Sequence, residues 1–518
     1  MTMNTKTMAQ SSENNKRIAK NTLLLYVRMF FIMGVSLYTS RVILDILGEV
    51  DFGIYNVVGG FVLMFTFISG AMVTATQRFL SFEIGKGEKG NVQSLFSTAV
   101  IIHVALAGII LLMAETIGLW FLNTQMNFPP ERNEAANWVF QFSVLTFLIN
   151  VISVPYNAAI IAYEKMAAFA YVSIIEVVLR LLILYLLLIS PIDRLVLYAI
   201  LLAIIAIVVR IMYGVYCNRK FEKCKCNWKW NRQFGTQMMS FVGWNMIGAT
   251  ADIAKEQGVN VVLNIFFGAA VNAARGIAYQ VLVAIRRFVD NFQMAMKPQI
   301  VKLYASNEKQ EMFKLVFNGS KLSYLMILTL SLPVILEAPF ILEFWLKKVP
   351  DYTVIFSRLV LIMSLIDSLS GTLIASMQAS GKVRDYQIVV GGISLMTLPL
   401  VYVAFKCGCP PYMAMYIGIG ISACCHIARL ILLKKTIGLP VRSFLVKVTG
   451  KVAIVSMISL VLPLAIHCFL PTGWLTFFLV CSVSVLSTLS FSFLLALDAN
   501  EKTFVINKAK AIIKKIRK

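Results

Sequence analysis

The sequence predicts an all-α integral membrane protein with about fourteen transmembrane helices. Of its 518 residues, 59% are hydrophobic and 14% are charged, whereas soluble domains average about 45–50% apolar and 25% charged residues. The apolar residues gather in runs of roughly 20, the length at which a helix spans a bilayer. These runs fill most of the chain and exclude a large soluble catalytic domain, so we expect the function to lie within or between membrane helices.

The apolar runs form three groups in chain order. Six runs precede a basic segment, six follow it, and two more end the hydrophobic part of the chain. The first group lies at 21–43, 54–77, 95–121, 137–161, 168–189 and 195–216; the second lies at 238–266, 270–295, 315–344, 353–377, 386–406 and 411–433; the last pair lies at 449–470 and 473–496.

These groups set the predicted domain organisation, which is two pseudo-symmetric six-helix lobes around a central cavity plus two C-terminal helices. The predicted parts are a cytoplasmic N-terminal segment (1–20), an N-lobe (21–216), a basic cytoplasmic interlobe loop (217–236), a C-lobe (237–433), a cytoplasmic loop (434–448), the last two helices (449–496) and a basic cytoplasmic tail (497–518).

The formal net charge of +23 reflects membrane topology better than nucleic-acid binding, because the Lys and Arg residues fall in short segments between the apolar runs. Alternate segments carry most of them, whereas the opposite loops carry only Arg132, Arg194, Lys347 and Lys348. Since cytoplasmic loops are enriched in Lys and Arg, both termini are predicted to be cytoplasmic. Trp228 and Trp230 lie in the basic interlobe loop and are interpreted as interfacial anchors, so no nucleic-acid partner is expected.

A weak internal repeat relates the two groups of six helices. A shift of 220 residues places VILDILGEVDFGIYNVVGGF, from Val42, on VLNIFFGAAVNAARGIAYQV, from Val262, with Gly48 on Gly268. Both stretches join the first and second helices of their bundle, and both bundles start in the cytoplasm. This pattern is typical of parallel repeats about an axis along the membrane normal.

The stretch SRVILDILGEVDFGIYNVVGGFVLMFTFISGAMVTATQRFLSFEIGKG, from Ser40 to Gly87, resembles the amino-terminal region of the polysaccharide-export flippases. The features are Arg41 near the end of the first span, Leu47-Gly48 with Gly53-Ile54-Tyr55 opening the second, and Gln77-Arg78-Phe79 closing it. This family includes O-antigen and capsule repeat-unit flippases and belongs to the multidrug/oligosaccharidyl-lipid/polysaccharide (MOP) exporter superfamily.

The resemblance implies a flippase that moves a polyprenyl-diphosphate-linked oligosaccharide from the cytoplasmic to the periplasmic leaflet of a bacterial inner membrane by alternating access. It implies a V-shaped central cavity, membrane lipids as surroundings, and polysaccharide polymerases or glycosyltransferases as neighbours. Drug exporters of the superfamily typically have twelve spans, so the last two spans favour a lipid-linked cargo. A cation-coupled multidrug or organic-cation exporter and a lipid II flippase remain the alternatives.

Four basic residues in or beside spans are candidates for substrate binding, because a guanidinium or ammonium group can bind a diphosphate. Arg28 has no acid three or four residues away, and it either faces the cavity or extends to the cytoplasmic headgroups. Arg275 either adds a cation to the cavity or marks the interface. The four candidates are Arg28, Arg41, Lys255 and Arg275.

Four acidic residues within spans are candidates for coupling to Na⁺ or H⁺, since a charge in the membrane needs a partner or a wet cavity. Asp252, Lys255 and Glu256 share one helix face, where Lys255 is expected to pair with one of the acids. Glu176 is four residues before Arg180, a spacing that favours mutual neutralisation over a role in transport. Asp367 is either an ion carrier or an acid hydrogen-bonded by neighbouring serines, and it completes the set of Asp252, Glu256, Asp367 and Glu176.

No metal, cofactor or catalytic centre is expected. The three His residues lie on distant spans, Cys224 and Cys226 lack the Cys-x-x-Cys spacing of zinc sites, and no GxxxxGK[ST] loop is present. A membrane enzyme such as a polymerase would need a long outer loop, whereas the longest one here, 122–136, is short. We therefore expect a transporter rather than an enzyme.

Overall fold

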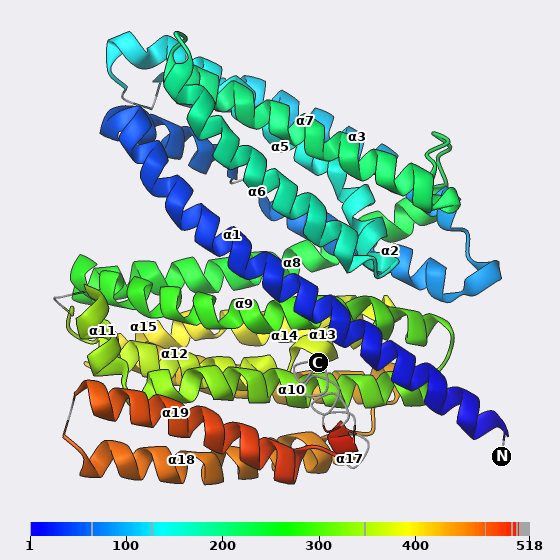
Figure 1. The fold of residues 1–518 in the computed structure, drawn as a ribbon, viewed down its shortest axis with the longest axis vertical. Helices are drawn as coiled ribbons and strands as arrows, with labels where there is room; N and C mark the ends of the chain where they lie inside the picture. Colours follow the sequence, from blue (N-terminus) through cyan, green and yellow to red (C-terminus); the bar gives the residue numbers. More distant parts are fainter. Residues whose placement is uncertain are drawn as a thin grey trace, which may run out of the picture. The chain divides into compact units, whose positions relative to one another are not determined.

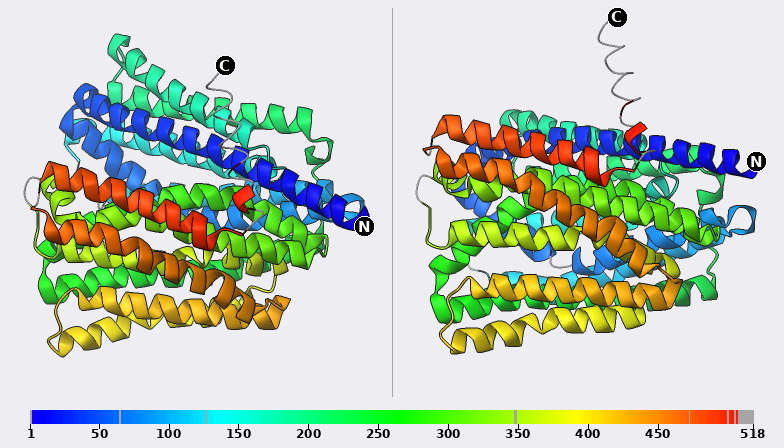
Figure 2. Two further views of the ribbon diagram at one scale, coloured as in Figure 1. Left: turned by 60° about the horizontal axis from the view of Figure 1, so that its bottom comes forward. Right: turned by 90° about the horizontal axis from the view of Figure 1, so that it is seen from below.

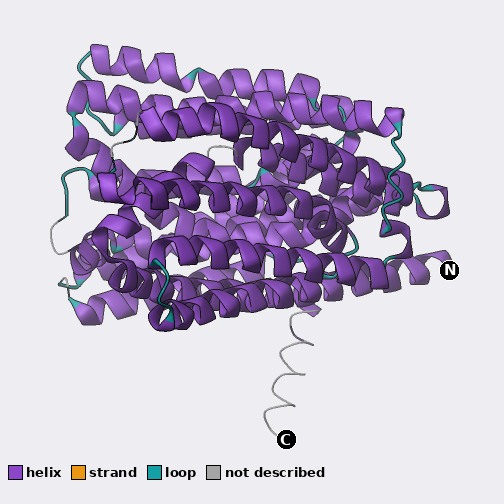
Figure 3. Cartoon of the chain, turned by 90° about the horizontal axis from the view of Figure 1, so that it is seen from above, coloured by secondary structure: helices purple, strands orange, loops and turns teal. Residues whose placement is uncertain are grey.

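A computed structural model shows that the chain is built from helices. It describes residues 2–63, 66–124, 126, 128–346, 349–471, 473–498, 501–503 and 506, with side chains from Arg17 onward except at a few helical positions, among them Arg41. Within this part there is no β-strand (Figure 3). The predicted all-α membrane fold class is confirmed.

The chain divides into two compact units. Unit 1 comprises Met1–Ala249 and Ala295–Glu308, and unit 2 comprises Thr250–Met294 and Lys309–Lys518. The boundary falls inside two long helices, α8 (Arg232–Phe267) and α9 (Ala269–Ala305). The lobe boundaries derived from the sequence stay a prediction.

Unit 1 is built around α5, which packs against five other helices of that unit, α1, α2, α3, α6 and α7 (Figure 1). It contains the internal Pro155 and a row of small or branched apolar residues that are almost fully buried. The helices of this unit are α1 (Thr2–Leu63), α2 (Thr66–Gly85), α3 (Val92–Met113), α4 (Leu119–Thr124), α5 (Asn133–Ala162), α6 (Met166–Ile189) and α7 (Arg194–Lys220).

Unit 2 has its core between α8, α9, α10, α12 and α16, where Phe356 and Val360 are fully buried. The remaining helices are α10 (Lys309–Leu336), α11 (Ala338–Leu346), α12 (Thr353–Ser368), α13 (Gly371–Ser380), α14 (Arg384–Leu395), α15 (Thr397–Lys406), α16 (Met413–Ile437), α17 (Val441–Phe444), α18 (Lys451–Phe469) and α19 (Trp474–Phe491).

Eleven helical segments in the described part of the chain are long and apolar enough to cross a membrane, so the chain is a multi-pass membrane protein. The other three predicted spans, at 54–77, 238–266 and 270–295, also lie on helices, in α1 and α2, in α8 and in α9. These three predicted spans are not among the eleven apolar segments. Helices α8 and α9 carry several charged residues each. Low apolarity is expected of helices whose polar side chains face protein or water rather than lipid.

The repeated glycines both have a positive φ. Gly48 interrupts α1 at a φ of 76°, and Gly268 separates α8 from α9 at a φ of 81°. This left-handed region is accessible to glycine and unfavourable for residues with a Cβ. The weak sequence repeat therefore marks a helix break that recurs in both halves of the chain.

The final helix pair packs against α10 within unit 2. Helices α18 and α19 lie side by side and both contact α10 (Figure 2). Near the middle of α10, Lys321 is almost fully buried and donates hydrogen bonds to the Ala496 carbonyl at 3.1 Å and to Glu501 at 2.8 Å. Directly after the end of α10, Glu337 is hydrogen-bonded to Nδ1 of His467 at 2.8 Å. Polar contacts thus link α10 to α18 and to the segment that follows α19.

Candidate functional site

The break at Gly268 creates a polar site inside unit 2 by folding α9 back against α8. Glu256 on α8 and Arg275 on α9 are 19 positions apart, which would separate them by about 28 Å along one continuous helix. In the structure, an Nη of Arg275 donates a hydrogen bond to Oε2 of Glu256 at 2.8 Å. The turn between the helices therefore determines which charges meet.

Arg275 is the centre of this cluster, and its side chain is only 5% exposed. Its guanidinium also donates to the side-chain oxygen of Asn260 and, at 3.1 Å, to the hydroxyl of Tyr279. The guanidinium carbon of Arg275 lies 4.4 Å from the centroid of the Tyr279 ring. One guanidine nitrogen, Nε, is buried without a hydrogen-bond partner. Arg275 is thus held in place with one donor still unused.

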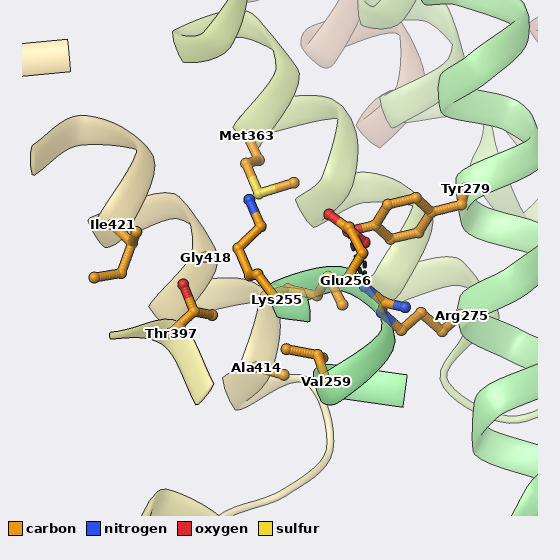
Figure 4. A pocket seen from close by; sticks show the side chains of 11 residues that line it. Lys255, Glu256, Val259, Arg275, Tyr279, Met363, Thr397, Ala414, Gly418 and Ile421 are labelled. Carbon is orange, nitrogen blue, oxygen red and sulfur yellow. Dashed lines mark hydrogen bonds and ion pairs between the residues drawn. The ribbon is translucent and has the colours of Figure 1, made fainter. Parts of the chain in front are cut away.

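Lys255 lines a small pocket beside this cluster. Figure 4 shows Lys255 extending toward Met363, whereas Glu256 turns to Arg275 and Tyr279. The pocket volume of about 30 Å³ suits one or two water molecules or a small ion and is too small for a sugar headgroup. Lys255 forms no hydrogen bond or ion pair with any residue that the structure describes. The expected pairing of Lys255 with an acid on its own helix is therefore wrong, because Glu256 binds Arg275 instead.

The two aspartates of unit 2 have different surroundings. The hydroxyl of Ser394 donates a hydrogen bond to Asp252 at 3.2 Å, and Asp252 is exposed. Near Asp367, the hydroxyls of Ser364 and Ser368 donate to backbone carbonyls three residues earlier. The alternative in which serines satisfy the Asp367 carboxylate is wrong for these two residues.

A polar network around Arg429 could not be recognised from the sequence. Arg429 on α16 donates to the hydroxyls of Tyr386 at 3.0 Å and Ser370 at 3.1 Å, and it interacts electrostatically with Asp367. Ser370 is also hydrogen-bonded to His426. These residues come from separate helices without any local spacing pattern. The only signal was an arginine inside an apolar run, the same signal that singled out Arg28.

In unit 1, two predicted site residues lie near each other. Arg28 on α1 stacks over the ring of Phe169 on α6 at 4.5 Å and interacts electrostatically with Glu176. Glu176 accepts a hydrogen bond from Arg180 at 2.7 Å, as the four-residue spacing predicted. Glu176 is thus paired directly with Arg180, and Arg28 lies near this pair. Arg41 lies in α1, but its side chain is outside the described part of the structure.

A second network in unit 1 was also missed. Arg132 pairs with both Asp51 and Asp193, although these residues are 81 and 61 positions away. Burial raises the pKa of Asp193, but hydrogen bonds from Arg132 and from two backbone N–H groups outweigh it and bring the pKa below its usual range. Arg132 ends the short 3₁₀ helix before α5, and Asp193 directly precedes α7, so this network joins helix ends.

Comparison with known proteins identifies the fold through structure and not through sequence. No protein-family model matches the chain, and no curated protein matches it. Several solved structures are similar to this chain over most of their own length. A multidrug resistance MATE family transporter of the MOP superfamily, in an outward-facing conformation, has a TM-score of 0.69 and 12% identity, covering 83% of this chain and 96% of its own.

Two further structures agree with this result. A MOP superfamily transporter from Pyrococcus furiosus, whose binding pocket is described as having reverse polarity, has a TM-score of 0.66 and 13% identity, covering 82% of this chain and 96% of its own. The Vibrio cholerae MATE transporter VcmN in the bent form has a TM-score of 0.65 and 15% identity, covering 85% and 99%. The chain therefore has the fold of the MATE transporters of the MOP superfamily.

Proposed function

We propose that the chain is an alternating-access flippase for a polyprenyl-diphosphate-linked oligosaccharide, working in a bacterial inner membrane with both termini in the cytoplasm. In this proposal the diphosphate binds to basic side chains, the sugars pass through the protein and the lipid tail stays in the bilayer. No covalent chemistry is required. The fold is that of known transporters, and the Ser40–Gly87 stretch resembles polysaccharide-export flippases.

One observation carries the choice of an anionic substrate: in each unit, a group of neighbouring charged side chains contains two cations and one carboxylate. Arg28 and Arg180 have Glu176 in unit 1. Among the residues that line the pocket in unit 2, Lys255 and Arg275 have only Glu256. Each group has an excess positive charge, which favours a phosphate over an organic cation. Lys255 is the better phosphate ligand of the two because Arg275 already has three side-chain partners.

A multidrug or organic-cation exporter is the second candidate, and it is at least as well supported by the structural matches. The similar structures include a multidrug resistance transporter. Unit 2 also contains the membrane acids Asp252, Glu256 and Asp367, which could bind an organic cation or a coupling ion. Those matches cover 82–85% of this chain and 96–99% of their own, so this chain carries segments beyond the shared fold.

Coupling to Na⁺ or H⁺ would use the carboxylates that can exchange partners. Glu256 is the strongest candidate, because a proton or Na⁺ on its carboxylate would release the guanidinium of Arg275. Asp367 is the second, since Arg429 faces it without a direct ion pair among the described contacts. Asp252 is the third, bonded only to a serine hydroxyl in the described contacts. Glu176 is already paired with Arg180 and is the weakest.

The test is a flipping assay in proteoliposomes. A polyprenyl-diphosphate oligosaccharide is placed in both leaflets, and its exposure to an external glycosidase is followed with time. The parent should expose the inner pool, and Lys255→Met should slow this at least about tenfold, which corresponds to one lost charge-assisted contact. Lys434→Met is the matched control, because Lys434 is an exposed lysine outside both charged groups.

Two results would reject the proposal. If the Lys255→Met protein flipped the lipid as fast as the parent, Lys255 would not bind the diphosphate. If the parent moved no lipid but exported an organic cation from the same liposomes, the second candidate would replace the first. Asp252→Asn, Glu256→Gln and Asp367→Asn proteins would then be measured for loss of that export under imposed Na⁺ or proton gradients.

A further inference from the structure

Residues 217–236, which comprise the end of α7, the connecting loop and the start of α8, form a basic surface with two exposed tryptophans. It carries one acid, Glu222, against six basic residues, all of them exposed and none in an ion pair with a described residue. Trp228 is 65% exposed and Trp230 is 53% exposed. The basic residues of this surface, called the interlobe patch below, are Arg219, Lys220, Lys223, Lys225, Lys229 and Arg232.

The interlobe patch is held in place by the body of unit 1. The backbone N–H of Asn227 donates to the hydroxyl of Ser97 at 3.1 Å, and that of Asn231 donates to Thr98 at 3.2 Å. Both hydroxyl residues are fully buried on α3. Closer to α7, the ring of Phe221 stacks on Tyr163 at a centroid distance of 4.2 Å. The patch is therefore fixed at its start, middle and end.

The two tryptophans are presented rather than buried. Trp228 has a φ of 55°, a left-handed conformation that is unfavourable for a residue with a side chain. The ring of Trp230 lies directly against Gly235, where a Cβ would clash with it. Helix α7 ends at Lys220 and is one of the eleven apolar spans, so the patch begins where a span leaves the membrane. An exposed indole among lysines at this depth fits the headgroup region of a bilayer.

We propose that the interlobe patch binds anionic phospholipids in the leaflet that it faces. Lysines and arginines attract the negative headgroups, and the two indoles insert between the glycerol and acyl regions. Because the backbone is fixed, the patch selects a local lipid composition instead of only neutralising charge. An acidic protein segment would satisfy the basic residues but would not require two exposed indoles beside a membrane span.

The test uses the full-length protein in nanodiscs of phosphatidylcholine that contain either brominated phosphatidylglycerol or an equal fraction of brominated phosphatidylcholine. Bromine quenches the fluorescence of nearby tryptophans. The Trp228→Phe/Trp230→Phe protein gives the fluorescence of the other tryptophans, which is subtracted. We expect the quenching assigned to Trp228 and Trp230 to be about twofold or more stronger with the anionic lipid. Added NaCl should reduce this preference, because salt screens exposed charges.

The variant is Lys223→Gln/Lys225→Gln/Lys229→Gln, which keeps both tryptophans. It should lose the preference for the anionic lipid while its unfolding temperature stays unchanged. The matched control is Lys382→Gln/Lys434→Gln/Lys435→Gln, three exposed lysines from other predicted cytoplasmic segments, which should keep the preference. Equal quenching by both lipids in the parent would overturn the proposal and leave an acidic protein as the partner to examine. Equal loss in the control would overturn it too, because net charge would then explain the effect.

Discussion

The helix pairs around Gly48 and Gly268 share a backbone break and differ in their chemistry. In unit 2, Arg275 and Glu256 form an ion pair across the break. The 220-residue shift places Tyr55 and Ser36 at the corresponding positions of unit 1. Tyr55 packs edge-on against Tyr198 at 4.9 Å, so an aromatic contact stands where unit 2 has a charged one. Both copies contain the break, whereas the charged pair is present at these positions in only one copy.

The largest expected effect is a difference in the free energy of unfolding between substitutions at two corresponding positions, Arg275 in unit 2 and Tyr55 in unit 1. Arg275→Met removes a buried cation and leaves Glu256 and Asn260 without their partner. We expect the free energy of unfolding to fall by about 2–3 kcal/mol, less than for a fully buried pair because Glu256 is partly exposed. Tyr55→Phe removes only a hydroxyl and should cost about 1 kcal/mol or less. Unfolding in mixed micelles titrated with SDS measures both, and equal losses would contradict the comparison.

The next effect should be equal in both copies. Alanine at Gly48 or Gly268 must adopt a positive φ, which costs about 1–3 kcal/mol, and no neighbouring atom lies close enough to add a clash. Both proteins should therefore lose similar stability in the same micelle assay. The control is Gly392→Ala, because Gly392 is an exposed helical glycine without a positive φ, and alanine there should be neutral or stabilising. A loss in only one copy would show that the breaks are not equivalent.

A smaller effect should distinguish two lysines within unit 2. Lys255→Met should change the free energy of unfolding by less than about 1 kcal/mol, because Lys255 has no hydrogen bond or ion pair with a described residue. Lys321→Met removes a buried lysine bonded to Glu501 and should cost more. If Lys255→Met were as destabilising as Lys321→Met, the role of Lys255 would be structural and not in substrate binding.

The smallest effect concerns acid stability at the far end of unit 2. The hydrogen bond from Lys451 holds the pKa of Asp498 below its usual range. A lowered pKa in the folded state stabilises the protein above the unfolded-state value of about 3.9, and this contribution is lost as the pH falls through the folded-state value. Asp498 is exposed, so the effect should be only a few tenths of a kcal/mol. The Asp498→Asn protein should lose less stability than the parent between pH 6 and pH 3.

The helices could be predicted because bilayer thickness leaves a strong signal in the sequence. Where the structure describes them, the predicted spans fall on helices, including α8 and α9, which are not among the eleven apolar segments. The alignment of Gly48 with Gly268 also identified a real equivalence, since a left-handed break needs the same residue type in both copies. The pairing of Glu176 with Arg180 followed from helical spacing alone.

The partners of the site residues could not be predicted because they come from other helices. Lys255 was expected to pair with a neighbouring acid, but the turn at Gly268 places Arg275 beside Glu256, and Arg275 pairs with it instead. Asp51, Arg132 and Asp193 are far apart in the sequence, and their clustering depends on which helix ends meet. Spacing along one helix reports local pairs only, so contacts across helices need the structure.

The turn at Gly268 also bears on how the protein is made. Neither α8 nor α9 is apolar enough to stand among the eleven segments that could cross a membrane on their own composition. Their charges Glu256 and Arg275 neutralise each other only after α9 has folded back on α8. Membrane entry of either helix alone would expose an unpaired charge to lipid, at a cost of about 2.5–3.5 kcal/mol. We therefore expect the two helices to leave the translocation channel together, as a preassembled hairpin.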